Sequence, residues 1–147
     1  MARTYTVDAS VFLNAFNPLE VGCQESHQLL ALLQARAVPL IVPALLLPEA
    51  AAAIRRGRDD EDLARQFVRA LSRLPHLMLV PVDKTLAHQA SDMAAQYRLR
   101  GSDAVYAAVA LRFGSILVTL DQEQREQVTA VITTCYPAEA LLELKPE

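Results

Sequence analysis

Hydrophobic positions along the chain fall into two patterns: short continuous apolar runs, and longer segments in which apolar residues recur every three or four positions. The short runs are typical of buried strands, and the longer pattern is typical of helices that pack on one face. We predict strands over residues 4–7, 39–43, 77–82, 115–120 and 130–134. We predict helices over residues 10–16, 25–37, 47–57, 58–75, 83–101, 102–114 and 137–144. Strands and helices therefore alternate along the chain.

This alternation predicts an α/β fold, because parallel strands need a crossover connection that is usually a helix. Strands that are apolar on both faces indicate a sheet covered by helices on both sides. The expected architecture is a three-layer α/β/α sandwich with a mainly parallel central sheet. No linker or repeat interrupts the pattern, so we expect residues 1–147 to form a single domain.

Four residues are candidates for helix ends. Asp83 and Ser102 stand directly before helical segments and are predicted N-caps. Gly57 and Gly114 follow helical segments and are predicted to stop them.

The composition bounds the class of protein. Hydrophobic residues make up 52% of the 147 positions, which is ample for a core, and the net charge of −3 does not by itself indicate a nucleic-acid partner. The longest apolar stretch, residues 38–54, is broken by prolines and a Glu, so we expect no membrane span. We see no signal peptide, and Cys23 and Cys135 match no metal spacing. A cytoplasmic protein with free thiols is expected.

Acidic residues recur where predicted strands end or helices begin. Asp8 and Asp121 directly follow strands, Asp103 opens a helix, and Glu49 lies near the start of another. Ligands of open parallel sheets bind beyond the carboxyl ends of the strands. Four carboxylates gathered there would repel one another unless a cation neutralised them. Ligand sets made only of oxygen suit Mg²⁺ or Mn²⁺ rather than zinc.

Each acid also has an ordinary structural explanation. Asp8 could cap the following turn, Asp121 could cap residues 123–128, and Asp103 could favour its helix N-terminus through the helix dipole. Glu49 could simply face solvent. We favour a shared site, because all four explanations would have to hold together at one edge of the sheet.

Four motifs occur in the order and approximate spacing of PIN-domain ribonucleases: VDASVFL, the Glu of PEAAAAI, GSDAVYAAVA and LVTLD. The chain resembles in particular the VapC-like toxins of bacterial and archaeal toxin–antitoxin pairs. The resemblance covers nearly the whole chain, since the ending ITTCYPAEALLEL is similar to that family's last strand and helix.

The resemblance implies that an acidic quartet binds the metal and is catalytic. Its members are Asp8, Glu49, Asp103 and Asp121. The implied activity is that of an endoribonuclease dependent on Mg²⁺ or Mn²⁺. In such an enzyme a metal-activated water attacks the phosphodiester in line, leaving a 3′-hydroxyl and a 5′-phosphate.

The resemblance also implies supporting residues. Ser10 and Thr119 match hydroxyl positions that help to hold the ion or its waters, and Asn14 is near enough in sequence to join them. One departure is Pro48, which removes a helix donor directly before Glu49 and is expected to affect how that carboxylate is aimed.

The implied partners are an RNA substrate, a cognate antitoxin bound over the active-site groove, and a second copy in a homodimer. No membrane association is implied. The alternative is a non-catalytic PIN-like module that binds RNA or protein, although such modules usually lose one or more acids. A phosphatase of the haloacid dehalogenase class is disfavoured, because it needs a second Asp where this chain has Ser10.

Other charged or titratable residues have no motif around them. We interpret His27, His76 and His88 as surface or packing residues. The arginines of residues 55–73 form either a solvated helix face paired with the acids of residues 59–62, or a rim that guides phosphates or contacts an antitoxin. We slightly favour the solvated face.

Overall fold

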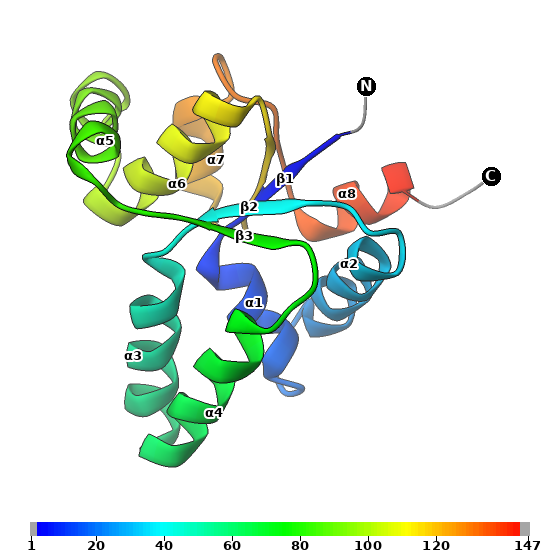
Figure 1. Ribbon diagram of the computed structural model, residues 1–147. Helices are drawn as coiled ribbons and strands as arrows, with labels where there is room; N and C mark the ends of the chain where they lie inside the picture. The colour runs from blue at the N-terminus through cyan, green and yellow to red at the C-terminus, as the bar shows by residue number, and fades with distance from the viewer. Residues whose placement is uncertain (1–2, 145–147) are drawn as a thin grey trace.

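The computed structural model describes residues 3–144 and contains one five-stranded sheet (Figure 1). The strands are β1 (Tyr5–Val7), β2 (Leu40–Pro43), β3 (Leu77–Val80), β4 (Ile116–Val118) and β5 (Thr134–Cys135). Their order across the sheet is β3-β2-β1-β4-β5, and every described pair of neighbours is parallel. The prediction of a mainly parallel sheet is confirmed.

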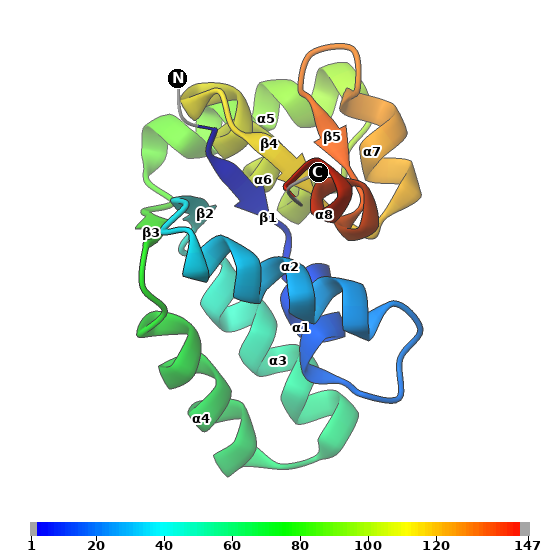
Figure 2. The ribbon, with the colours of Figure 1, turned by 90° about the vertical axis from the view of Figure 1, so that its right-hand side faces the viewer.

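Helices cover both faces of this sheet, as the sequence predicts. They are α1 (Ala9–Phe16), α2 (Cys23–Ala35), α3 (Leu46–Arg58), α4 (Glu61–Ser72), α5 (Lys84–Tyr97), α6 (Gly101–Phe113), α7 (Gln122–Val128) and α8 (Pro137–Leu144). On one face α6 packs against the strands with α5 outside it, and on the other face lie α1, α2 and α8 (Figures 1 and 2). The α3–α4 hairpin extends away from the sheet beside α1 (Figure 1). The architecture is a three-layer α/β/α sandwich.

The order of the strands reverses between β1 and β4. From β1 the chain crosses to β2 through α1 and α2, whereas β4 is reached from β3 through α5 and α6 on the opposite face (Figure 2). Because the two crossovers diverge, the loops after β1 and β4 leave a crevice beyond the carboxyl ends of the strands. This topology fixes where a ligand site can form.

The strands in the middle of the sheet are completely buried. All residues of β1 and β2 are buried, and Val7 lies in register with Val118 of β4. Their β-branched and aliphatic side chains suit a sheet that is covered on both faces. At the edge, β3 is less buried, and Met78 is half exposed. The core is therefore centred on β1 and β2, and β1 also leads directly to Asp8.

Two of the four predicted helix ends are confirmed. The Asp83 side chain accepts a hydrogen bond from Leu86 N at 2.9 Å, and Gly114 ends α6 in the left-handed region at a φ of 62°. The other two predictions are wrong. Helix α3 continues through Gly57 to Arg58, and the chain turns at Asp59, which adopts a φ of 49°.

The predicted cap at Ser102 is displaced by two residues. Helix α6 begins at Gly101, the N-cap position belongs to Arg100, and Ser102 lies inside the first turn. Arg100 has an extended backbone, and its Nε donates to Asp103 in the first turn of the helix. This shift matters for the site, because Arg100 contacts two of the predicted acids.

One further local prediction is corrected. The strand predicted over residues 130–134 is mostly a turn, and β5 comprises only Thr134 and Cys135. Helix α3 runs without a break through Pro48, because Pro48 lies in the first turn, where amide hydrogens have no partner within the helix. Within residues 3–144, no helix is long and apolar enough to cross a membrane.

Candidate active site

A cavity of about 550 Å³ opens beyond the carboxyl ends of β1 and β4. All four predicted acids line it, and they come from four separate parts of the chain. Asp8 follows β1, Glu49 lies on α3, Asp103 lies in the first turn of α6, and Asp121 precedes α7. The fold thus brings together residues up to 113 positions apart, counted from Asp8 to Asp121.

Asp8 is the most buried of these acids, with only 8% of the residue exposed. Its backbone N–H donates to the Val118 carbonyl at 2.9 Å, which extends the pairing of β1 with β4 by one residue. Its side-chain Oδ2 accepts from Ser10 N at 3.1 Å and caps α1. Burial raises the pKa of Asp8, the hydrogen bonds from Ser10 oppose this shift, and the charge of Asp121 adds to it.

Asp103 and Asp121 both accept hydrogen bonds from the guanidinium group of Arg100. Arg100 Nε donates to Asp103 Oδ2 at 3.1 Å, and its Nη2 donates to Asp121 Oδ2 at 2.5 Å. Burial raises the pKa of Asp103, Arg100 opposes the shift, and the charges of Asp8 and Asp121 reinforce it. The other oxygen of Asp121, Oδ1, accepts from Gln124 N at 3.1 Å and caps α7.

Glu49 faces the cavity from the α3 wall. Its Oε1 is buried and accepts no well-formed hydrogen bond from the part of the chain that the structure describes, although the Tyr106 hydroxyl lies near enough to affect the pKa of the carboxyl group. Burial raises the pKa of Glu49, Tyr106 opposes the shift, and the charges of Asp8 and Asp103 add to it. A buried carboxylate oxygen without a good donor is costly and suits an additional ligand there.

The two predicted hydroxyl residues support the site in different ways. Ser10 lines the cavity, and its Oγ accepts from Leu120 N at 3.3 Å, which ties α1 to the loop after β4. Thr119 is completely buried, and its Oγ1 accepts from Asp121 N at 3.0 Å and lies 2.9 Å from Gln124 Oε1. Since a hydroxyl has one hydrogen, donation to Gln124 leaves the 3.5 Å approach to Asp8 as a marginal contact.

The structure places Asn14 outside the cavity that the other predicted site residues line or adjoin. Its Nδ2 donates to Glu20 Oε1 at 2.8 Å and to the Val21 carbonyl at 3.0 Å, and its Oδ1 accepts from Ser26 Oγ at 2.6 Å. The residue is fully buried and fastens the loop between α1 and α2. One turn of helix beyond Ser10 carries it away from the cavity.

Gln124 and Arg100 also belong to the site, although neither was predicted from the sequence. Gln124 is 1% exposed, and its Nε2 donates to the Asp103 backbone carbonyl at 3.3 Å, so it links α7 to the start of α6. A signal for Gln124 was present, because an N-cap Asp followed three residues later by Gln is a capping-box pattern. Nothing in the pattern identified Arg100, because its role depends on where α6 begins.

The three histidines are exposed and lie outside the cavity, as expected for surface residues. The arginines of α3 and α4 fall into two groups, one paired with acids on a solvated face and one beside the acidic cavity. Arg55 and Arg65 pair with Asp59 and Glu61, as a solvated face would. Arg56, in contrast, lines the acidic cavity from α3.

The donor set of the cavity fits a hard divalent cation, because all its acidic ligands are oxygens and one of them, Glu49 Oε1, has no good donor. Within residues 3–144, however, no three acidic, histidine or cysteine side chains are grouped closely enough to hold an ion in their present positions. The positive charge between Asp103 and Asp121 is instead supplied by Arg100.

The PIN domain family model matches residues 5–128, so the chain belongs to the PIN domain family. The matched segment contains the whole acidic quartet and both hydroxyl residues. No curated protein sequence matches the chain.

Solved structures with the same fold have low sequence identity. PAE2754 from Pyrobaculum aerophilum aligns with a TM-score of 0.71 at 22% identity, covering 98% of each chain. VapC20 of Mycobacterium tuberculosis, a toxin that cleaves the sarcin–ricin loop, has a TM-score of 0.69 at 18% identity, covering 88% of this chain and 97% of that one. The VapBC2 complex of Rickettsia felis, bound to promoter DNA, has a TM-score of 0.68 at 11% identity, covering 90% and 98%. The predicted PIN-like, VapC-like fold is confirmed.

Proposed function

We propose that the protein is an endoribonuclease, dependent on Mg²⁺ or Mn²⁺, and the toxin of a toxin–antitoxin pair in the cytoplasm, with residues 1–147 as one domain. One observation carries the nuclease assignment. Asp8, Glu49, Asp103 and Asp121 converge on one cavity at the point where the strand order reverses. Membership of the PIN domain family and the fold shared with VapC20 support it.

In this proposal the four carboxylates hold the metal, and the hydroxyl residues keep two of them in place. Ser10 fixes Asp8 through its backbone N–H, and Thr119 fixes the backbone of Asp121. Glu49 contributes the oxygen that has no good donor among residues 3–144. A bound Mg²⁺ or Mn²⁺ would lower the pKa of a bound water, so that it could lose a proton and attack the phosphorus. The ion would also stabilise the negative charge that develops on the phosphoryl group.

The direct test is cleavage of RNA by the purified protein. We expect cleavage with Mg²⁺ or Mn²⁺, none with EDTA, and recovery when the metal is restored in excess. The products should carry 3′-hydroxyl and 5′-phosphate ends. Cleavage that persists under chelation would contradict the metal-dependent mechanism, and RNA binding without cleavage would favour a non-catalytic module. Sequencing RNA 5′ ends after induction in cells would identify the target.

The antitoxin assignment rests on fold similarity to proteins from toxin–antitoxin complexes of Rickettsia felis and Klebsiella pneumoniae. We expect the cognate antitoxin to bind over the acidic cavity. Co-expression with the product of a small neighbouring reading frame should give a co-purifying complex without nuclease activity. Failure to bind or inhibit would remove the toxin assignment and leave the nuclease assignment intact.

A homodimer is proposed as well. Leu111 and Phe113 near the end of α6 are 51% and 41% exposed, which is high for large apolar side chains. Light scattering should give twice the monomer mass of 16.2 kDa. A monomer mass over a wide range of concentrations would contradict the dimer.

A further inference from the structure

Arg100 is held in the site by its two carboxylate contacts. Its guanidinium group donates to Oδ2 of Asp103 and to Oδ2 of Asp121, and both residues belong to the proposed metal site. The arginine side chain is 72% exposed, whereas those of Asp103 and Asp121 are 15% and 25% exposed. The acids are therefore fixed by the fold, and the arginine reaches them from the solvent side.

Two further observations indicate that this bridge can open. Exposed ion pairs contribute little stability, because solvent screens them and ordering a long side chain costs entropy. Arg100 also has no second function that requires its guanidinium group to stay, since its contribution to α6 is made by the backbone N-cap. A divalent cation concentrates more charge in less space than a guanidinium group and would compete for the same oxygens.

We propose that Arg100 is a displaceable internal cation of the acidic site. It neutralises Asp103 and Asp121 while no metal is present, and metal binding must break both of its contacts. This inference rests on the proposed function, because it assumes that the quartet is the metal site. It explains why the four acids converge on one cavity while no three of those described are grouped tightly enough to hold an ion.

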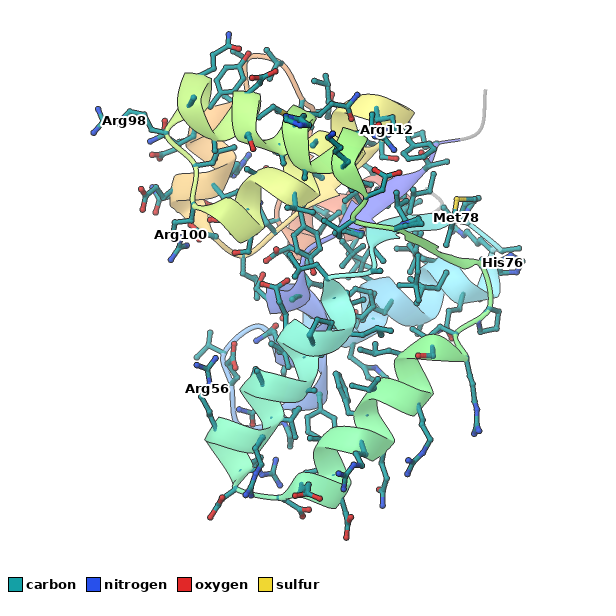
Figure 3. The ribbon with its side chains drawn as sticks, turned by 60° about the vertical axis from the view of Figure 1, so that its left-hand side comes forward. Arg56, His76, Met78, Arg98, Arg100 and Arg112 are labelled. Atoms are coloured by element: carbon teal, nitrogen blue, oxygen red, sulfur yellow. The ribbon has the colours of Figure 1, made fainter. Side chains whose placement is uncertain are left out.

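Once released, Arg100 would remain at the mouth of the cavity. Arg56 lines the same cavity from α3, and Figure 3 shows both arginines on the same side of the molecule. Two guanidinium groups beside a metal site are suited to the phosphate oxygens of an RNA strand. Arg100 is thus a positioning residue that exchanges carboxylates for phosphate.

The test is a calorimetric titration of Mn²⁺ into RNA-free protein, comparing wild type with Arg100→Gln. We expect the variant to bind Mn²⁺ more tightly, by up to about 5-fold, the factor that corresponds to the upper range of exposed ion pairs. Equal or weaker binding by Arg100→Gln would overturn the proposal.

Arg98→Gln is the matched control. Arg98 lies two residues away, makes no ion pair among the described residues, and points outward from the end of α5 (Figure 3). Arg98→Gln removes the same charge as Arg100→Gln. If both variants bound Mn²⁺ more tightly by the same factor, the cause would be overall charge, and the proposal would be overturned.

Asp103→Asn separates this inference from the proposed function. If Asp103→Asn leaves Mn²⁺ affinity unchanged, the metal site is elsewhere, and if neither wild type nor Arg100→Gln binds Mn²⁺, there is no metal site; in either case both proposals fail. If Asp103→Asn weakens binding while Arg100→Gln leaves it unaltered, the metal site stands and only the role of Arg100 is wrong.

Discussion

The junctions β1–α1 and β4–α7 are alike in sequence and different in the fold. In each, an Asp stands between a strand and the next helix and caps that helix; Asp8 directly follows β1, whereas Asp121 stands three residues after β4. Asp8 lies under the site with 8% of the residue exposed, and its Oδ2 contacts come from Ser10 and, marginally, Thr119. Asp121 is more exposed and has an arginine beside it. One Asp can therefore both cap a helix and line a polar site. Its burial and its neighbouring charges determine how far the charged carboxylate destabilises the folded protein.

The largest effect on RNA cleavage should come from replacing Asp103, the acid that lies near the aspartates of both junctions. Asp103→Asn takes away a charge that faces Asp8 and Asp121, and we expect RNA cleavage to fall by about 100-fold or more, the scale of losing one preorganised electrostatic group. Initial rates at saturating Mg²⁺ measure the effect.

Asp92→Asn is the control for this comparison, because Asp92 is an exposed acid on α5 outside the cavity. It should retain wild-type cleavage. Similar losses in both variants would show that overall charge, rather than the site, determines the rate.

The β4–α7 junction depends on a buried amide that the β1–α1 junction lacks. Gln124→Met removes the bond to the Asp103 carbonyl and leaves that group and Thr119 with fewer partners. We expect the free energy of unfolding to fall by about 1–3 kcal/mol, measured by urea denaturation. Gln122→Met, on the exposed face of the same helix, should change it by less than about 0.5 kcal/mol. Equal effects would rule out a special role for Gln124.

The two aspartates should differ in their effect on the metal-free protein. Asp8→Asn removes a buried charge and keeps a capping side chain, so we expect a melting temperature a few degrees above wild type in EDTA. Asp121→Asn removes an arginine partner, so it should give no comparable gain. Differential scanning fluorimetry compares them, and identical shifts would remove the distinction between the junctions.

The smallest effect concerns pH. Because the folded pKa values of Asp8, Glu49 and Asp103 are raised, the folded state binds these protons more tightly than the unfolded state does. Their contribution to stability therefore falls as pH rises from about 4, the ordinary carboxyl value, through the raised values. In EDTA the advantage of Asp8→Asn over wild type should grow across that range in urea denaturation. If the difference in unfolding free energy between Asp8→Asn and wild type did not change with pH, this would contradict the claim that burial raises the pKa of Asp8.

The sequence predicts the layers of the fold well, because continuous apolar runs such as residues 39–43 have few alternatives in a chain of this length. It also predicts which acids meet, since the ends of parallel strands share an edge. It could not place Arg100, because the pattern put this residue inside a helix over 83–101, whereas α5 ends at Tyr97 and Arg100 is the N-cap of α6. Closeness in sequence to Ser10 also did not place Asn14 at the cavity, because Asn14 lies one helical turn further along α1, where its side chain bonds Ser26 and Val21.

The central claim is that the strand β1 delivers Asp8 to a metal-dependent nuclease site, beyond its role as a helix cap. The most direct test is RNA cleavage by purified Asp8→Asn at saturating Mg²⁺, with circular dichroism to verify the fold. An amide can still cap α1, but it cannot supply the negative charge that binds a hard cation. We predict a folded protein whose cleavage is lost. Cleavage by the folded variant at the wild-type rate would contradict the account and leave Asp8 as a structural cap.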